Sequence, residues 1–177
     1  MAKLANRVLS VTTHIKDNLK ERINQLVIHL AKGLPVLVPY DSDANHEPTL
    51  LAGQRAHWAI LLGFCIAVDK NELSVEQTNG FADHNNPNLI HLKPKQPISD
   101  YLLDVINKKL YKKFWVYAKQ GKSKHLHIWD FNMLCESNCN LVKTSRKLNQ
   151  TDIVLPENGG IVRGLNNKCL FINSKSC

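Results

Sequence analysis

His57 is the side chain best suited to proton transfer. It opens the apolar run 57–67 directly after a polar loop, so its ring can face a cleft while the run fixes the backbone behind it. The ordinary pKa of histidine, about 6.5, suits a group that takes and returns a proton near neutral pH. A strand-end histidine that only hydrogen-bonds a neighbouring carbonyl has the same local sequence, so the pattern alone leaves both interpretations open.

A histidine base in a cysteine peptidase also needs a thiolate and a third group that orients the imidazole. Asp130 directly follows the predicted strand 125–129. If that strand lies beside the strand of His57, the Asp130 carboxylate can reach the far ring nitrogen, and Asn132 could do the same with its amide. Asp130 could equally cap the turn that begins at Phe131.

The cysteines do not supply an obvious nucleophile or a disulfide framework. They are five, an odd number, and scattered, which favours reduced thiols and a cytoplasmic protein. Cys135 and Cys139 are four residues apart, unlike the usual C-x2-C zinc pair, so we expect no metal and no cofactor there. A metal site built by His46, Glu47 and His57 from the polar loop is a separate alternative.

Composition bounds the class of protein. A chain of 177 residues with 44% hydrophobic residues is long enough for one domain with a core. No apolar run reaches the roughly 18 to 20 residues that a membrane span requires, and residues 1–20 do not resemble a secretory signal. We therefore expect a cytoplasmic monomer without a membrane partner.

The net charge of +8 favours an acidic partner. Because the Lys and Arg residues are dispersed and no nucleic-acid-binding motif is present, we expect no nucleic-acid partner. A solvated basic surface without a partner explains the charge, and an acidic protein substrate would fit it equally well.

The order of predicted elements indicates an α+β fold, with helices first and a mostly antiparallel sheet after them. Apolar periodicity predicts helices over 4–9 and 15–30, the second ended by Gly33, and a further helix that begins near Ser99. The two prolines in 34–39 predict an edge strand, and the run 57–67 predicts a buried central strand. Residues 69–97 form a variable excursion with a brief strand at 89–92.

The second half of the chain is expected to complete the sheet. Strands are predicted over 114–119 and 125–129, joined as a hairpin, with a helical turn over 131–140. Further short strands are expected over 153–155, 160–162 and 169–172.

Three separated blocks resemble the actin maturation protease family. They are Val38-Pro39-Tyr40-Asp41-Ser42-Asp43-Ala44-Asn45-His46-Glu47-Pro48 with Gln54-Arg55-Ala56-His57-Trp58-Ala59, then Ala118-Lys119-Gln120-Gly121-Lys122-Ser123 with Trp129-Asp130, then Glu136-Ser137-Asn138. A segment over 159–165 adds to the likeness, which is weakest over 69–97. The resemblance implies a papain-like cysteine peptidase fold, of which residues 1–177 are the C-terminal portion of one domain without the nucleophile helix.

The resemblance also implies an activity, a substrate and site residues. It implies a cytosolic aminopeptidase that removes the acetylated N-terminal residue, Met or Cys, of immature actin, whose N-terminus is acidic. It makes His57 the base and Asp130 the orienting acid, with His46, Glu47 and Trp58 as substrate contacts. The family's nucleophile lies in a Cys-Gly-Leu segment before the first block, which this chain lacks, so the chain alone is expected to be inactive. A non-catalytic actin-binding or interaction module is the alternative.

Overall fold

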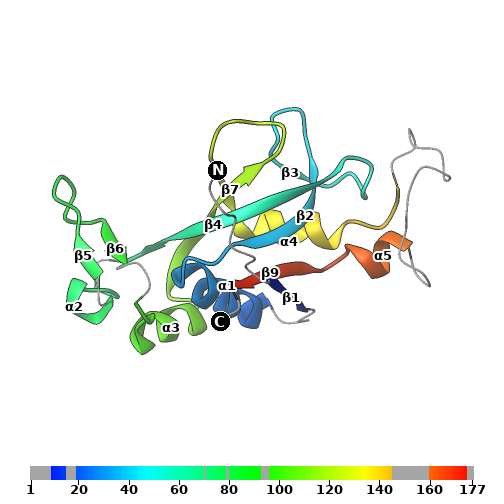
Figure 1. The fold of residues 1–177 in the computed structure, drawn as a ribbon. Helices are drawn as coiled ribbons and strands as arrows, with labels where there is room; N and C mark the ends of the chain where they lie inside the picture. The colour runs from blue at the N-terminus through cyan, green and yellow to red at the C-terminus, as the bar shows by residue number, and fades with distance from the viewer. Residues whose placement is uncertain are drawn as a thin grey trace, which may run out of the picture.

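One antiparallel sheet forms the centre of the molecule (Figure 1). The computed structural model describes residues 9–14, 19–69, 71–78, 80–92, 96–144 and 160–174. Across the sheet the strands run in the order β1, β9, β2, β4, β7, β8, and β3 pairs with the end of β2. Their bounds are β1 Leu9–His14, β2 Val36–Ser42, β3 Pro48–Thr49, β4 Ala56–Val68, β7 Tyr111–Gln120, β8 His127–Asp130 and β9 Cys169–Ser174.

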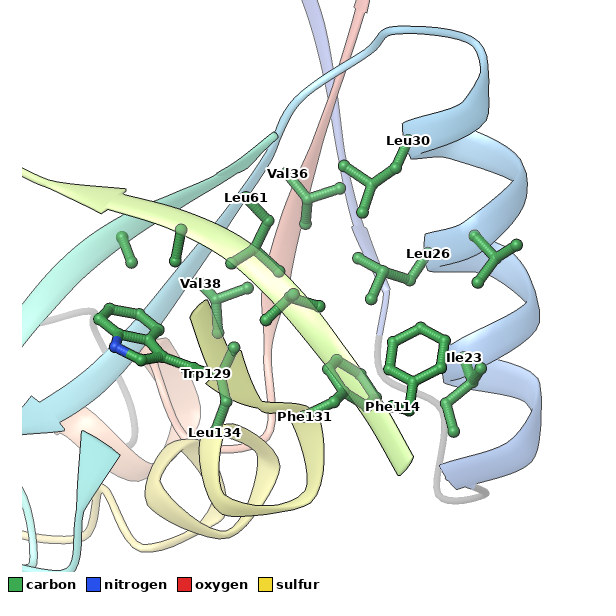
Figure 2. Packing of buried hydrophobic residues seen from close by; sticks show 14 of the residues in the cluster. Ile23, Leu26, Leu30, Val36, Val38, Leu61, Phe114, Trp129, Phe131 and Leu134 are labelled. Carbon is green, nitrogen blue, oxygen red and sulfur yellow. The ribbon is translucent and has the colours of Figure 1, made fainter. Parts of the chain in front are cut away.

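Three helices build the core together with this sheet. They are α1 Leu19–Ala31, α3 Asp100–Asn107 and α4 Phe131–Cys139. In Figure 2, Leu26 and Leu30 of α1 point toward the strands from one side, and Leu134 of α4 approaches them from another. The predicted α+β class and antiparallel sheet are confirmed. The predicted order, helices before the sheet, is wrong because β1 precedes α1 and pairs with β9.

Helix α1 confirms the helix predicted over 15–30 within the described residues. It ends as expected, since Gly33 takes a φ of 74° and donates its N–H to the Leu30 carbonyl at 2.9 Å. The helix predicted over 4–9 is different: Leu9 begins strand β1, and residues 4–8 lie outside the described residues. Helix α3 begins where expected, with the Ser99 hydroxyl accepting from the Leu102 N–H.

Strand β2 is an interior strand, which corrects the prediction of an edge strand over 34–39. It pairs with β4 on one side and with β9 on the other. The ladder with β9 extends only over Val36 and Leu37. Beyond it the Pro39 carbonyl accepts from the Asn138 amide at 2.8 Å, so the backbone of Pro39 faces α4 on this side. The proline is tolerated because no neighbouring strand needs its missing N–H there.

Strand β4 separates the two faces of the sheet. The inner face points into the core and carries Val38, Tyr40, His57, Ala59, Leu61, Val116, Ala118, Gln120, His127 and Trp129; the outer face carries Trp58, Leu62, Tyr117 and Ile128. Strand β4 is central, as predicted, but buried only at Ala59 and Leu61. Its pairing with β7 shifts between Leu61 and Gly63, so one extra residue interrupts the alternation.

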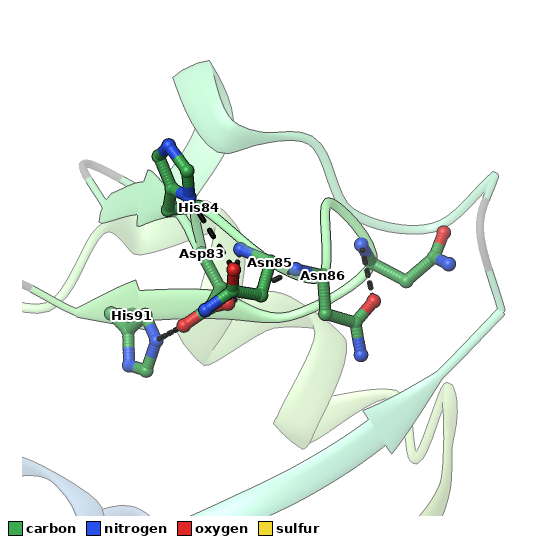
Figure 3. A network of polar contacts seen from close by, with 6 residues as sticks. Asp83, His84, Asn85, Asn86 and His91 are labelled. Atoms are coloured by element: carbon green, nitrogen blue, oxygen red, sulfur yellow. Dashed lines mark hydrogen bonds and ion pairs between the residues drawn. The ribbon is translucent and has the colours of Figure 1, made fainter.

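The excursion 69–97 folds into a small separate unit beside the end of β4. It contains α2 Val75–Thr78 and a hairpin of β5 Gly80–Ala82 and β6 Ile90–Leu92, which confirms the brief strand predicted at 89–92. Asp83 organises the hairpin loop (Figure 3): its carboxylate accepts from the N–H groups of Asn85 and Asn86 and contacts His91 Nε2 at 2.8 Å. The loop is thereby fixed by its own side chains.

The remaining elements are partly as predicted. Strands β7 and β8 form the expected hairpin, α4 is the expected helix and β9 the expected last strand. The strand predicted over 160–162 is wrong, because α5 Gly160–Gly164 is helical. The strand predicted over 153–155 lies outside the described residues. Within the described part of the chain, no helix is long and apolar enough to cross a bilayer.

Candidate functional site

His57 lies at the end of β4 where the inner face leaves the core. It is paired in register with Tyr40 on β2, and its ring is partly buried. Its Nε2 contacts the ammonium Nζ of Lys122 at 3.2 Å. Because a lysine ammonium can only donate, this contact requires an unprotonated Nε2, which places the ring proton on Nδ1. His57 is therefore held in the neutral, base-competent form.

The electrostatic surroundings of His57 favour the same state. Burial lowers the pKa of His57 below its ordinary value, and the positive charges of Lys122, His46 and Arg55 lower this pKa further. The Asp41 carboxylate acts in the opposite direction and is the weakest of these influences. The neutral imidazole is suited to accept a proton, and the cations beside it are suited to attract an acidic ligand.

Gln120 is the polar side chain on the neighbouring strand that faces the same way as His57. It lies opposite Ala59, two residues from His57, so it is the diagonal neighbour of His57 on the inner face. Its side chain is buried, and its Oε1 accepts from the Lys122 N–H at 2.7 Å. Its Nε2 has no hydrogen-bond partner within the described residues. Lys122 and Gln120 thus form a linked pair beside the imidazole.

The sequence did suggest the segment that supplies this pair, but not the roles of its members. The block 118–123 belongs to the resemblance, and strand alternation from Ala118 places Gln120 on the same face. Which strand lies next to His57 is a non-local property, so the sequence suggested Asp130 or Asn132 and gave Gln120 no role.

Asp41 fixes the loop that leads into His57. Its side chain is fully buried, and its carboxylate accepts from the N–H groups of Leu51, Gly53 and Arg55 at 3.1, 2.6 and 3.0 Å. Three N–H donors compensate the buried negative charge. The backbone that enters β4 is thereby held rigidly, which positions the ring of His57.

Helix α4 braces the other side of Asp41. Ser137 Oγ accepts from the Asp41 N–H at 2.9 Å and donates to the Asp41 carbonyl at 3.2 Å. Asn138 donates to the carbonyls of Pro39, Leu165 and Lys168. Both side chains are buried, and they hold β2 to α4 and to the segment before β9. Both belong to the block 136–138 that carries part of the family resemblance.

His46 and Glu47 lie on the same side of the molecule as His57, across from β8. His46 takes a φ of 69°, and its carbonyl accepts from the Tyr40 hydroxyl at 3.2 Å. Glu47 Oε1 lies 3.7 Å from His127 Nδ1, and the rings of His46 and His127 are 6.4 Å apart. These contacts brace the loop 43–47. Trp58 instead lies on the outer face, 43% exposed, and points away from His57.

Asp130 is not beside His57. Strand β8 pairs with β7 and not with β4, and Asp130 lies across β7 from Cys65, eight residues along β4 from His57. At about 3.3 Å per residue, that separation is roughly 25 Å. The geometry therefore corrects the expectation that Asp130 reaches the imidazole.

Asp130 instead caps helix α4. Its side chain accepts from the N–H groups of Asn132 and Met133, and Lys113 Nζ lies 3.9 Å from the carboxylate. Asn132 lies in the first turn of this helix and is equally distant from the histidine.

None of the cysteines that the structure describes contacts His57. Cys65 is half-buried on β4, and burial raises the pKa of its thiol. Burial raises the pKa of Cys135 to about 12 and that of Cys169 to about 11. Cys139 lies on α4 and donates to Asn167 Oδ1 at 3.1 Å. Raised pKa values disfavour the thiolate, so Cys65, Cys135 and Cys169 do not have the properties of a catalytic nucleophile.

A metal site also finds no support in the described part of the chain. No group of three or more His, Cys, Asp or Glu side chains is gathered there in a way that could hold a metal ion. The alternative of a site built by His46, Glu47 and His57 therefore does not match the geometry, because Glu47 turns toward His127.

Comparisons with known proteins show what the chain is similar to in sequence. Residues 1–65, which include His57, match a family model described as the C-terminal domain of actin maturation protease-like proteins. The chain is 32% identical to the human actin maturation protease over 184 residues, which are 100% of this chain and 50% of that protein. It is 31% identical to the zebrafish (Danio rerio) protein over 99% of this chain and 56% of that protein.

A more distant relative extends the match to insects. The actin maturation protease of Drosophila melanogaster is 30% identical over 81% of this chain and 39% of that protein. No solved structure matches significantly. The chain spans about half the length of the curated relatives it matches. By sequence the chain is therefore similar to the actin maturation proteases, over a region equal to about half of such a protein.

Proposed function

We propose that this chain carries the general base of a papain-like cysteine aminopeptidase that removes the acetylated N-terminal residue of actin in the cytosol. The observation that carries the proposal is the geometry of His57, a rigidly held imidazole whose Nε2 is unprotonated and faces the Lys122 ammonium. The thiolate is taken to come from a part of the protein that this chain does not contain. The names of the relatives support protease activity and actin as the substrate.

In the proposed reaction the imidazole moves one proton in each direction. His57 takes the proton of the cysteine thiol, and the thiolate attacks the carbonyl of the acetylated terminal residue. The imidazolium then gives its proton to the nitrogen of the departing chain. Water, with His57 again as the base, hydrolyses the acyl-enzyme and restores the thiol. The lowered pKa of His57 keeps the base available at neutral pH.

Lys122 would link substrate charge to the state of the base. While its ammonium lies against Nε2, the lone pair of His57 is occupied. Acidic residues of an actin N-terminus would draw Lys122 away and add negative potential, which frees Nε2 and raises the pKa of His57. Arg55, which also lowers this pKa, would contribute to the same attraction.

Gln120 would act on His57 through Lys122, which differs from the direct orienting role that the sequence suggested for Asp130. Its side chain is the buried amide diagonal to His57, and its bond to the Lys122 N–H fixes its own position. We assign it as a positioning residue. Gln120→Ala should move the acidic limb of the kcat/KM profile, whereas a purely structural role would change stability and leave the profile in place.

The decisive experiment uses the longest natural form of the protein that contains this chain and a nucleophile. Its substrate is an acetylated peptide that begins Met-Asp-Asp. We expect His57→Ala to lower kcat/KM at least ~1000-fold, as removal of a catalytic base does. Asp130→Asn, which preserves the helix cap, is the matched control and should stay within about twofold of the wild type. Equal turnover by the wild type and His57→Ala would remove His57 from the mechanism.

Substrate binding can be tested on this chain alone. The same acetylated peptide should bind with an affinity that falls as salt is raised from 50 to 300 mM, by roughly tenfold, because Lys122 and Arg55 meet carboxylates. A control peptide with Asn in place of each Asp should bind weakly at every salt concentration. Equal binding of both peptides would contradict electrostatic recognition at this site.

A further inference from the structure

Among the described residues, nothing pairs with one backbone edge of β4 beyond Leu61, and this stretch is called the free edge below. Strand β2 pairs with β4 only as far as Leu61, while β7 accompanies β4 on the other side to Val68. In an antiparallel strand every second residue directs its N–H and C=O to the same edge. Over 62–68, every second residue therefore directs its N–H and C=O away from β7, and none of these outward groups has a backbone partner among the described residues.

A cavity of about 780 Å³ lies against this edge. Three consecutive residues of β4 line it, Phe64, Cys65 and Ile66, although consecutive side chains of a strand point to opposite faces. Leu102 of α3 and Tyr117 of β7 line it as well, so the cavity reaches both faces of the sheet around this end of β4. Its volume is typical of a site that takes a ligand.

The opposite wall of the cavity is the excursion that contains α2 and the hairpin of β5 and β6. Val75 of α2 and the run Asn88–Leu92 of the hairpin loop and β6 line it. Asp83 holds the hairpin loop through two N–H groups and His91 (Figure 3). This wall stands opposite the free edge, and the cavity between them is the space that an extended segment would occupy.

The lining indicates the chemistry of that segment. Most of the lining side chains are apolar, and two of the ionisable ones already have partners: Asp69 lies 2.5 Å from Lys112, and His91 lies 2.8 Å from Asp83. Such a lining favours an uncharged, apolar segment and disfavours the acidic substrate proposed for His57. The site is also roughly 25 Å along β4 from that histidine.

We propose that the free edge of β4 binds an extended apolar segment of a second polypeptide, which adds to the sheet as a new strand. The backbone of the segment pairs with residues 62–68, and its side chains alternate between the wall of the excursion and the outer face. This docking site is separate from the proposed catalytic function and does not depend on it.

The test uses the wild-type chain and acetyl-Val-Thr-Val-Thr-Val-Thr-amide, with hydrogen exchange measured residue by residue. We expect the peptide to slow exchange at every second amide over 62–68, by ~10-fold or more, and to leave the amides of β8 unchanged. The same peptide N-methylated at every backbone nitrogen is the control, since it keeps the side chains and cannot pair. No protection at about 1 mM peptide, or equal protection by the methylated peptide, would overturn the proposal.

Two surface leucines of similar exposure provide matched variants. Leu89 lines the cavity and is 41% exposed, whereas Leu110 lies outside it and is 39% exposed. Leu89→Lys should weaken peptide binding ~10-fold because a charge enters an apolar site, and Leu110→Lys should bind as the wild type does. Equal binding by both variants would contradict the site. Concentration-dependent protection of 62–68 without peptide would show that a second copy occupies the edge, and would also overturn it.

Discussion

His57 and Asp130 show how far a single residue can be interpreted from sequence. The position of His57 at the mouth of an apolar strand was predictable, because a polar loop followed by a buried run is a local pattern. The partner of His57 was not predictable in the same way. Asp130 follows a strand that lies one position further across the sheet, and a local pattern carries no information on strand order.

The titration of His57 is the first prediction at this scale. Nuclear magnetic resonance should show the His57 pKa below 6.5, because burial and neighbouring cations both disfavour the imidazolium. Lys122→Met should raise this pKa toward its ordinary value without fully restoring it, since burial remains. Lys124→Met, at an exposed position nearby, should leave it unchanged. A wild-type pKa at or above the ordinary value would contradict the electrostatic account.

The same shift has a consequence for stability. Since the folded chain holds His57 at a lower pKa than the unfolded chain does, the unfolded state binds more protons as the pH falls below about 6.5. The contribution of His57 therefore lowers the free energy of unfolding as the pH falls from about 6.5 through the pKa that His57 has in the folded chain. His57→Gln should flatten this part of the curve of unfolding free energy against pH.

Asp130 gives a prediction that separates its structural role from a catalytic one. Asp130→Ala removes the cap of α4 and should lower the free energy of unfolding by about 1 kcal/mol in urea melts. Asp130→Asn should retain most of that stability. Neither variant should alter the titration of His57, and a shifted His57 pKa in Asp130→Ala would show that the two groups do interact.

At the scale of elements, local signals performed well and pairing signals did not. Helix α1, its end at Gly33 and the Ser99 cap of α3 follow from periodicity and capping, which act over a few residues. The interior position of β2 and the helical α5 contradict local expectation. Pro39 faces α4 where no strand needs its N–H, and three residues over 160–162 are too few for β-branched side chains to decide a structure.

Two glycines with positive φ provide a matched test of the loop before β4. Gly53 has a φ of 96°, and a Cβ there would lie 2.1 Å from the Lys143 carbonyl oxygen. Gly33 has a φ of 74° with open space around it. Gly33→Ala should cost about 1 kcal/mol of unfolding free energy, and Gly53→Ala at least ~3 kcal/mol, because backbone must move as well. Similar losses of unfolding free energy in both variants would show that the backbone at Lys143 moves easily to make room for the added Cβ.

At the scale of the whole molecule, the outer face of the sheet is unusually apolar. Trp58, Leu62 and Ile128 are 43%, 49% and 59% exposed on this face, and α1, α3 and α4 cover the opposite one. Exposed apolar patches of this kind favour association.

Association through this face can be measured directly. The double variant Leu62→Lys with Ile128→Thr should sediment as a smaller species than the wild type at the same concentration, because the patch loses its apolar centre. Val162→Thr changes a residue of similar exposure on α5 and is the control. A wild-type chain that stays monomeric at every concentration would show that the outer face does not drive association.

The register shift between β4 and β7 means that β4 contains one residue more than a regular strand needs at this point. Leu61 and Phe64 both face the core, and two residues stand between them where regular alternation needs one. A protein that lacked Leu62 would have an uninterrupted strand with every later side chain on its present side. A relative that lacks one residue at this point would therefore keep the architecture of the sheet. A relative that lacks one residue at Ala59 would instead carry His57 on the opposite face of the sheet from Gln120.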